Sequence, residues 1–303
     1  MTEKEIDLTK GELLDLLKKK LQNLNELQRF GKDSNYIQEL SDIALIQLQL
    51  NQYKNSEEKF LICLNHFKKQ KDRLGQAAVY GLLGTLYFKK GDYQKSIEFY
   101  ENAYDIYKLL NQIQEQITCL IGIGNSYLKI NKFDEACDIF LECSAICSEN
   151  NDIYNLLDCL GNLVYIYKNK EKWDVVFELY KKSLKVFKEL KDYKGIITAY
   201  FNLGIIRKKN NNLEESLRYF KKGTNIAIEA NYSELVIKGL CYVGEVLFHI
   251  GKQKEAINQF IKASGLAKKI NAKNAIIQLE ILLKSLGMND QTQIKQFTKN
   301  ENK

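Results

Sequence analysis

The chain has 303 residues, of which 45% are hydrophobic and 27% charged, so a largely disordered protein is excluded because there is enough apolar surface for a core. The net charge of +7 comes mostly from lysines interleaved with acidic residues, which favours solvated helix faces over a nucleic-acid surface. There is no proline and the 17 glycines are scattered, so no Pro-rich or Gly-rich linker divides the chain.

The cysteines and the apolar runs indicate in which cellular compartment the protein lies. Most of the seven cysteines lie in apolar stretches, and the N-terminus lacks the basic and then apolar pattern of a secretory signal. No apolar run approaches the roughly 18 to 20 residues that cross a bilayer. We therefore expect a soluble, cytoplasmic protein with reduced thiols and no membrane insertion.

The first predicted element is a helix over residues 8–30, and a repeated unit follows it. The stretch AAVYGLLGTLYFKKGDYQKSIEFYENAY begins at Ala77, and its counterpart ITCLIGIGNSYLKINKFDEACDIFLECS begins at Ile117. The two stretches begin 40 residues apart, and further steps of 40 residues along the chain need no gap. The repetition predicts six units, over residues 37–76, 77–116, 117–156, 157–196, 197–236 and 237–273.

Columns of small and aromatic residues run through the units. One small-residue column is Ala44, Gly84, Gly124, Val164, Gly204 and Gly244, and a second is Ser56, Ser96, Ala136, Val176, Ser216 and Ala256. The aromatic column, sixteen residues after the first, is Phe60, Tyr100, Phe140, Tyr180, Phe220 and Phe260. Small residues allow one helix to lie close against the next, and the ring fills the gap between them.

Each unit is predicted to contain two helices. Apolar residues recur at helical spacing, as at Tyr80, Leu83 and Tyr87, and polar or glycine signals such as Gly91 and Asn131 break the unit in the middle. One column marks the predicted ends of the second helices: Lys71, Asn111, Asn151, Lys191, Asn231 and Asn271.

These columns resemble the tetratricopeptide repeat, whose pattern is matched by Leu83, Gly84, Tyr87, Ser96, Tyr100 and Ala103. The resemblance implies an all-α protein, a right-handed α-solenoid of six helix pairs. The family norm is about 34 residues, and the longer unit found here is similar to that of Pins-type adaptors, Rap-type regulators and several ciliary proteins. The family's closing proline is absent, and Arg207 stands in a column of Tyr or Leu.

The segments outside the repeats are predicted to cover their ends. Residues 1–36 contain an N-terminal cap helix and residues 274–287 a C-terminal capping helix, which would shield the open core of the array. The last segment, 288–303, is polar and rich in lysine, and we expect it to be a disordered tail.

Catalytic, metal and cofactor sites are not expected. The two histidines, His66 and His249, lie far apart in the sequence and near no suggestive partner. Cys137, Cys143 and Cys147 share one predicted helix but lack the C-x2-C spacing of zinc sites, so they are interpreted as core thiols. Gly122 and Gly124 lie within a predicted helix and lack the third glycine of a dinucleotide site, so they are interpreted as helix-packing residues.

The resemblance implies that the first helix of each pair lines a concave groove, through positions 2, 5, 6, 9, 12 and 13 counted from Ala77. Asparagine amides can pair with an extended peptide backbone, and lysines favour acidic side chains. The predicted partner-binding residues are Lys89, Asn125, Lys129, Asn162, Tyr165, Lys168, Asn202, Lys208 and Lys209. Alternatively, the lysines only complement the helix dipoles at helix C-termini.

The predicted function is a non-catalytic scaffold or adaptor that binds an extended, acidic peptide or a partner helix as part of a larger complex. Heavy use of Asn, Lys, Ile and Tyr is typical of an A/T-rich protist genome and favours a ciliary or cytoskeletal assembly. The chaperone-adaptor carboxylate clamp is disfavoured because position 5 is never lysine. Two alternatives stay open: a Rap-like regulator of a signalling protein and a nucleic-acid-binding helical repeat, which the acidic Glu245 in the predicted groove weakens.

Overall fold

The computed structural model describes residues 8–29 and 34–288, in which the secondary structure is entirely helical. The predicted disordered tail lies outside this range except for Met288. The helices are α1 (Lys10–Leu27), α2 (Ser34–Gln49), α3 (Tyr53–Lys69), α4 (Arg73–Lys90), α5 (Tyr93–Leu109), α6 (Ile113–Lys129), α7 (Phe133–Glu149), α8 (Ile153–Asn169), α9 (Trp173–Glu189), α10 (Tyr193–Lys209), α11 (Leu213–Glu229), α12 (Ser233–His249), α13 (Gln253–Lys269) and α14 (Lys273–Ser285).

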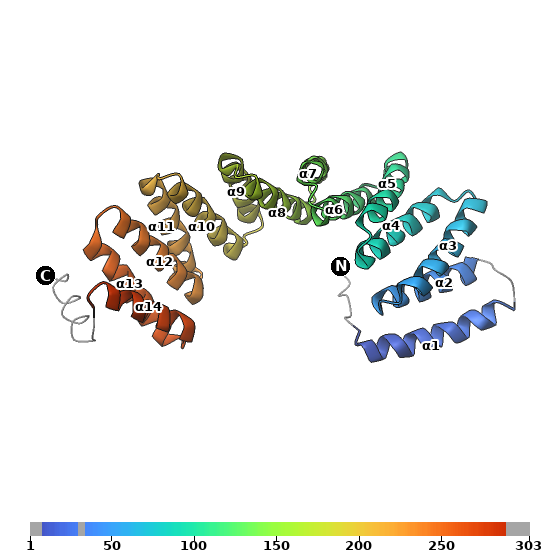
Figure 1. Ribbon diagram of the computed structural model, residues 1–303, viewed down its shortest axis with the longest axis horizontal. Helices are drawn as coiled ribbons and strands as arrows, with labels where there is room; N and C mark the ends of the chain where they lie inside the picture. The colour runs from blue at the N-terminus through green and yellow to red at the C-terminus, as the bar shows by residue number, and fades with distance from the viewer. Residues whose placement is uncertain (1–7, 30–33, 289–303) are drawn as a thin grey trace. The chain divides into compact units, whose positions relative to one another are not determined.

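The chain divides into two compact units, Met1–Asn162 and Leu163–Lys303, with the boundary inside α8. In the first unit the successive helices from α1 through α7 pack against one another, and in the second those from α9 through α14 do the same (Figure 1). This packing of consecutive antiparallel helices is that of an α-solenoid. It confirms the predicted all-α fold class, whereas the count of six repeats and the boundaries of the domains stay predictions.

The small-residue column lies directly against the aromatic column, as predicted. A Cβ atom added to Gly84 would come within 2.7 Å of the Tyr100 ring, and one added to Gly204 would come equally close to Phe220. The rings are buried as a result, and Phe220 is 1% exposed. At Gly84 and Gly204 the ring of the second helix therefore occupies the place that a side chain of the first helix would take.

The second small-residue column adds a hydrogen bond to this packing. The hydroxyl of Ser216 donates to the carbonyl of Gly204 at 2.7 Å, and Ser56 and Ser96 make the same bond with Ala44 and Gly84. Each serine is fully buried. The bond supplies a partner for a polar group that would be costly to bury alone.

Left-handed residues end the helices at regular intervals. The predicted ends of the second helices, which include Lys71, Asn111 and Lys191, all have positive φ angles, at 55°, 53° and 54° for these three. The residues that end the first helices have them too: Asn51, Gly91, Asn131, Glu171, Asn211 and Gly251. At each turn the following N–H reaches back to a carbonyl, as Asn212 does to Arg207 at 2.8 Å, which is the Schellman arrangement.

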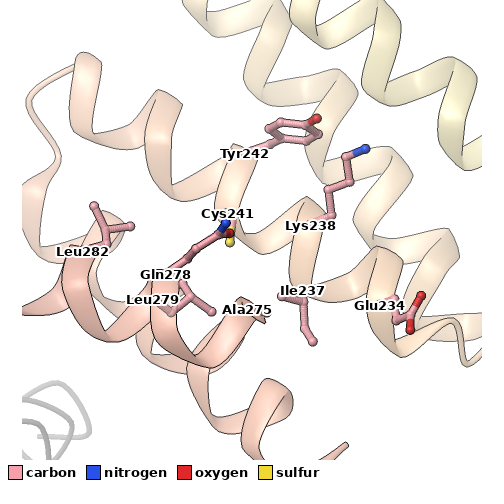
Figure 2. A pocket seen from close by; sticks show the side chains of 9 residues that line it. All are labelled: Glu234, Ile237, Lys238, Cys241, Tyr242, Ala275, Gln278, Leu279 and Leu282. Atoms are coloured by element: carbon pink, nitrogen blue, oxygen red, sulfur yellow. The ribbon is translucent and has the colours of Figure 1, made fainter. Parts of the chain in front are cut away.

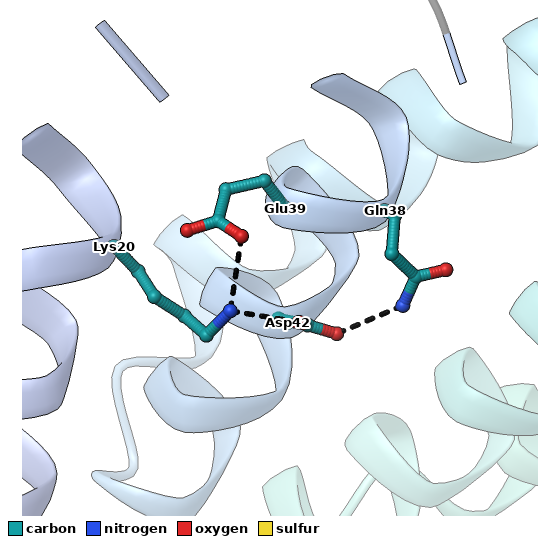
Figure 3. Close-up of polar contacts among 4 residues, drawn as sticks. All are labelled: Lys20, Gln38, Glu39 and Asp42. Carbon is teal, nitrogen blue, oxygen red and sulfur yellow. Dashed lines mark hydrogen bonds and ion pairs between the residues drawn. The ribbon is translucent and has the colours of Figure 1, made fainter. Parts of the chain in front are cut away.

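The helix α1 occupies the segment predicted to be the N-terminal cap helix and packs on α2. Thr9 and Glu12 begin it with a capping box, in which each side chain bonds to the backbone N–H of the other. The ammonium group of Lys20 bonds to Glu39 at 3.0 Å and to Asp42 at 2.8 Å on α2, as Figure 3 shows together with the amide that Gln38 donates to Asp42. Burial alone would lower the pKa of Lys20, but the bonds to Asp42 and Glu39 outweigh it and raise the pKa.

The last described helix, α14, occupies the segment predicted to be the C-terminal cap and packs on α13. Leu279 and Leu283 are buried, whereas Ile277 and Ile281 are 57% and 64% exposed. Within residues 8–29 and 34–288, no helix has the length and apolar character needed to cross a membrane.

Candidate functional site

The predicted partner-binding residues all lie on the first helices of the pairs, namely α4, α6, α8 and α10. In the first unit α4 contacts α6, and in the second α10 contacts α12, so first helices of neighbouring pairs lie side by side. We call the surface that they form within each unit the first-helix face. Lys89, Asn125, Lys129 and Asn162 belong to the first unit, and the other five predicted residues belong to the second.

The three asparagines are half-buried on this face. Asn125, Asn162 and Asn202 are each partly exposed, and each lies next to a buried residue in its helix. Tyr165 is 54% exposed on α8. These side chains are accessible at the predicted positions, and their role in binding stays a prediction.

The prediction that position 5 lines the groove is wrong for Phe201, in the repeat unit 197–236. Phe201 is only 3% exposed, because Gly223 and Gly239 leave room for its ring inside the second unit. Its ring meets that of Tyr242 edge-on, with centroids 5.5 Å apart. The position therefore contributes to the core in this pair.

Three of the five predicted lysines have partners within the chain. Lys208 forms an ion pair with Glu245 on α12 at 2.7 Å, and Lys168 donates to the hydroxyl of Tyr180 on α9 at 2.9 Å. The ammonium of Lys209 lies 3.7 Å from the centroid of the Trp173 ring, within cation–π range. These contacts narrow the basic surface that an acidic partner would meet.

Each of the five lysines lies in the last turn of its helix, where a positive charge also complements the helix dipole. Lys89 and Lys129 are exposed. The alternative that these residues serve helix ends thus stays open beside the binding interpretation.

A cavity of about 430 Å³ lies on the first-helix face of the second unit, between α12 and α14 (Figure 2). It is lined from α12 by Glu234, Ile237, Lys238, Cys241 and Tyr242, and from α14 by Ala275, Gln278, Leu279 and Leu282. Positions 2, 5 and 6 of the repeat unit 237–273 are Lys238, Cys241 and Tyr242. Positions 2 and 6 recur one unit later at Gln278 and Leu282, a signal that the sequence contains but that the assignment of α14 as a cap concealed.

The wall of this cavity is held in place by aromatic packing. Tyr242 stacks on Phe220 with ring centroids 4.7 Å apart, and the ammonium of Lys238 lies 5.8 Å from the Tyr242 ring. Burial raises the pKa of the Cys241 thiol to about 11, so this cysteine stays protonated at neutral pH. The cavity offers a rigid aromatic surface, one exposed cation and one amide for recognition.

Cysteines of two helices meet in the first unit. The sulfur atoms of Cys143 and Cys147 on α7 and of Cys159 on α8 lie within 4.8 Å of one another, and all three side chains are fully buried. Cys137, which the sequence groups with the first two, is buried outside this cluster. Cys159 was missed because it lies on the next helix, and only side-chain direction brings it close.

Hydrogen bonding and burial shift the pKa values of these three thiols in different directions. The hydrogen bond with Cys159 raises the pKa of Cys143, and burial raises the pKa of Cys147 to about 12. The same bond from Cys143 lowers the pKa of Cys159, because donors stabilise its thiolate. In the described part of the chain, this is the one group of three or more His, Cys, Asp or Glu residues placed so that it could hold a metal ion.

The comparisons with known proteins agree with this architecture. Tetratricopeptide-repeat family models match residues 37–108 and residues 197–227. No curated protein matches the sequence.

Solved structures share the fold at low identity. The apo form of RapI has a TM-score of 0.53 and 13% identity, covering 86% of this chain and 99% of that one. Aspartyl phosphate phosphatase F from Bacillus subtilis has a TM-score of 0.53 and 13% identity, covering 93% and 85%. BtubC from P. vanneervenii has a TM-score of 0.50 and 16% identity, covering 71% and 90%. The matches identify tetratricopeptide repeats in residues 37–108 and 197–227, and the solved structures share the helix-pair fold.

Proposed function

We propose that this protein is a non-catalytic adaptor or regulator that binds an extended segment of a protein partner on its first-helix face. The observation that carries the proposal is the cavity between α12 and α14, which combines a fixed aromatic wall with exposed polar groups. Its volume of about 430 Å³ is in the range of pockets that enclose ligand groups. A large apolar side chain of the partner would fit inside it.

The polar groups around the cavity favour a peptide with acidic residues next to its apolar anchor. Lys238 is exposed at the cavity, and Gln278 can both donate to and accept from a peptide backbone. Glu234 on the rim would repel an acidic residue at its own end. We therefore expect the acidic residue of the partner to lie on the Lys238 side.

Asn202 would extend this contact along the first-helix face of the second unit. Within the first unit, Asn125 and Asn162 are partly exposed residues whose amides suit an extended backbone. Lys208 contributes less than predicted because Glu245 already neutralises it. The same ion pair places a carboxylate on this face, which weakens the nucleic-acid alternative.

A displayed library of random peptides tests this proposal with defined ligands. We expect the full-length protein to select peptides with a large apolar residue near Asp or Glu. Lys238→Glu should weaken the binding of a selected peptide at least about tenfold, because it places like charges opposite each other. Lys262→Glu on α13 makes the same charge change at an exposed position of the second helix and should leave binding unchanged. Failure to select peptides, or equal losses in both variants, would refute the proposal.

The cellular setting that we propose is a cytoplasmic complex of the ciliary or cytoskeletal kind, and residue usage is what supports it. The regulator alternative is favoured by the fold likeness to RapI and aspartyl phosphate phosphatase F. At 13% identity that likeness concerns the fold alone, so no phosphatase activity is transferred to this chain.

A further inference from the structure

Three buried thiols converge in the first unit, and the proposed function uses none of them. Cys143 and Cys147 lie one turn apart on α7, and Cys159 reaches them from α8, with the three sulfur atoms within 4.8 Å of one another. Each cysteine is 0% exposed. The cluster thus brings three soft ligand atoms together in a dry site.

The repeat itself does not require sulfur at these positions. In the other repeat units, the residues equivalent to Cys147 are Phe67, Tyr107, Phe187, Ala227 and Ala267. Alanine stands in the place of Cys143 at Ala103 and Ala263, and in the place of Cys159 at Ala199. The same helix packing therefore forms with rings or with small apolar residues, whereas three thiols lie close together where α7 meets α8.

We propose that Cys143, Cys147 and Cys159 form a three-sulfur site for a trivalent, thiophilic metalloid of the arsenite class. The ligand enters as uncharged As(OH)3. Three As–O bonds break and three As–S bonds form, and each thiol proton leaves with a hydroxide as water. No electron is transferred, so neither an oxidant nor a reductant is needed.

The charge of the product selects this ligand class over divalent and monovalent metals. A site with three thiolates around Zn²⁺ or Cu⁺ carries net negative charge, and burying uncompensated charge is costly. Asp152 and Asp158 add negative charge near Cys159. Zinc also takes a fourth ligand in structural sites, whereas trivalent arsenic is satisfied by three sulfur atoms and its complex is neutral.

The chain provides matched controls for a test. Cys63 occupies the place of Cys143 in the first helix pair, and both thiols point to a backbone carbonyl, at 3.7 Å from Ile37 and 3.9 Å from Ile117. Cys119 occupies the place of Cys159 one unit earlier and is also buried. Cys63→Ala and Cys119→Ala therefore remove a buried thiol from an equivalent position without touching the cluster.

The experiment is titration of the reduced, full-length protein with sodium arsenite, followed by native mass spectrometry and thermal unfolding. We expect one arsenic per chain, bound with loss of all three hydroxyl groups, and a raised Tm because the ligand joins α7 to α8. In Cys143→Ala and Cys159→Ala the arsenic should keep a hydroxyl group and dissociate at concentrations that saturate the wild type. Cys63→Ala and Cys119→Ala should bind as the wild type does.

Circular dichroism of each variant shows whether it is folded, and Cys147→Ala, which copies the alanine found at Ala227 and Ala267, provides a third removal. The proposal is overturned if the wild type binds no arsenite or if the two control variants lose binding equally. It is also overturned if Zn²⁺ or Cu⁺ occupies the cluster while arsenite fails to compete, because the charge argument would then be wrong.

Discussion

The pairs α10–α11 and α8–α9 share one repeat pattern but pack differently. In α10–α11, Gly204 lets the Phe220 ring approach until it is 1% exposed, and Ser216 bonds to the Gly204 carbonyl. In α8–α9, Val164 and Val176 stand in the two small-residue columns, and the Tyr180 ring is only half-buried.

The difference shows how a packing column determines chemistry on the first-helix face. Because the Tyr180 ring is not fully enclosed, its hydroxyl is available to Lys168, which donates to it at 2.9 Å. Lys168 is one of the lysines predicted to bind a partner. In α10–α11 the equivalent ring, Phe220, has no hydroxyl, and the equivalent lysine, Lys208, pairs with Glu245 instead. The residue in the aromatic column therefore affects which partner the lysine contacts.

The largest loss of stability should come from removing the rings of Phe220 and Tyr180. Phe220→Ala should lower the free energy of unfolding of the second unit by about 3 to 5 kcal/mol, as expected for a buried aromatic residue. Tyr180→Ala should cost roughly half as much, because its ring has withdrawn less area from water. Urea denaturation followed by circular dichroism compares them, and equal losses would contradict the packing difference.

Exchanging the small residues should give an intermediate effect. Gly204→Val places a side chain where the Phe220 ring lies, and we expect a loss of about 1 to 3 kcal/mol from overpacking. Val164→Gly should cost about 1 kcal/mol or less, because the lower helix propensity of glycine is offset by closer approach of the ring. Thermal unfolding measures both, and a Gly204→Val variant as stable as the wild type would show that the column tolerates volume.

The smallest effect concerns the turns that end α8 and α10. Glu171 has a φ of 55° and Asn211 a φ of 57°, a conformation that costs most residues about 1 to 2 kcal/mol but asparagine less. Glu171→Gly should therefore stabilise the protein by about 1 kcal/mol, and Asn211→Gly by only a few tenths. If the two substitutions shift the urea midpoint equally, the strain assigned to Glu171 is absent.

The fold could be read from the sequence because each column depends on a single spacing. Gly84 lies sixteen residues before Tyr100, and the structure places the ring on the glycine as predicted. The ends of the second helices were predicted from a column of asparagines that also includes Lys71 and Lys191. The left-handed turn at Glu171 had no such signal, because glutamate is an unusual residue there.

The candidate site was less predictable because it depends on contacts between helices. Lys208 and Glu245 lie in neighbouring repeat units of the second compact unit, and their ion pair requires both side chains to extend toward each other. Cys159 joins Cys143 and Cys147 through the same kind of contact. Periodicity places residues on a face of a helix, but it does not say which side chains on adjacent helices will meet.

The regular left-handed turns have a consequence for how the gene can change. They recur at a constant spacing of half a repeat unit from Asn51 to Asn271, so each helix pair begins and ends at equivalent points of the chain. Duplication or loss of one whole pair between two such turns keeps every column in phase with its neighbours. Array length, and with it the extent of binding surface, can thus change in a single recombination event, whereas insertion of one residue would shift a ring away from its glycine.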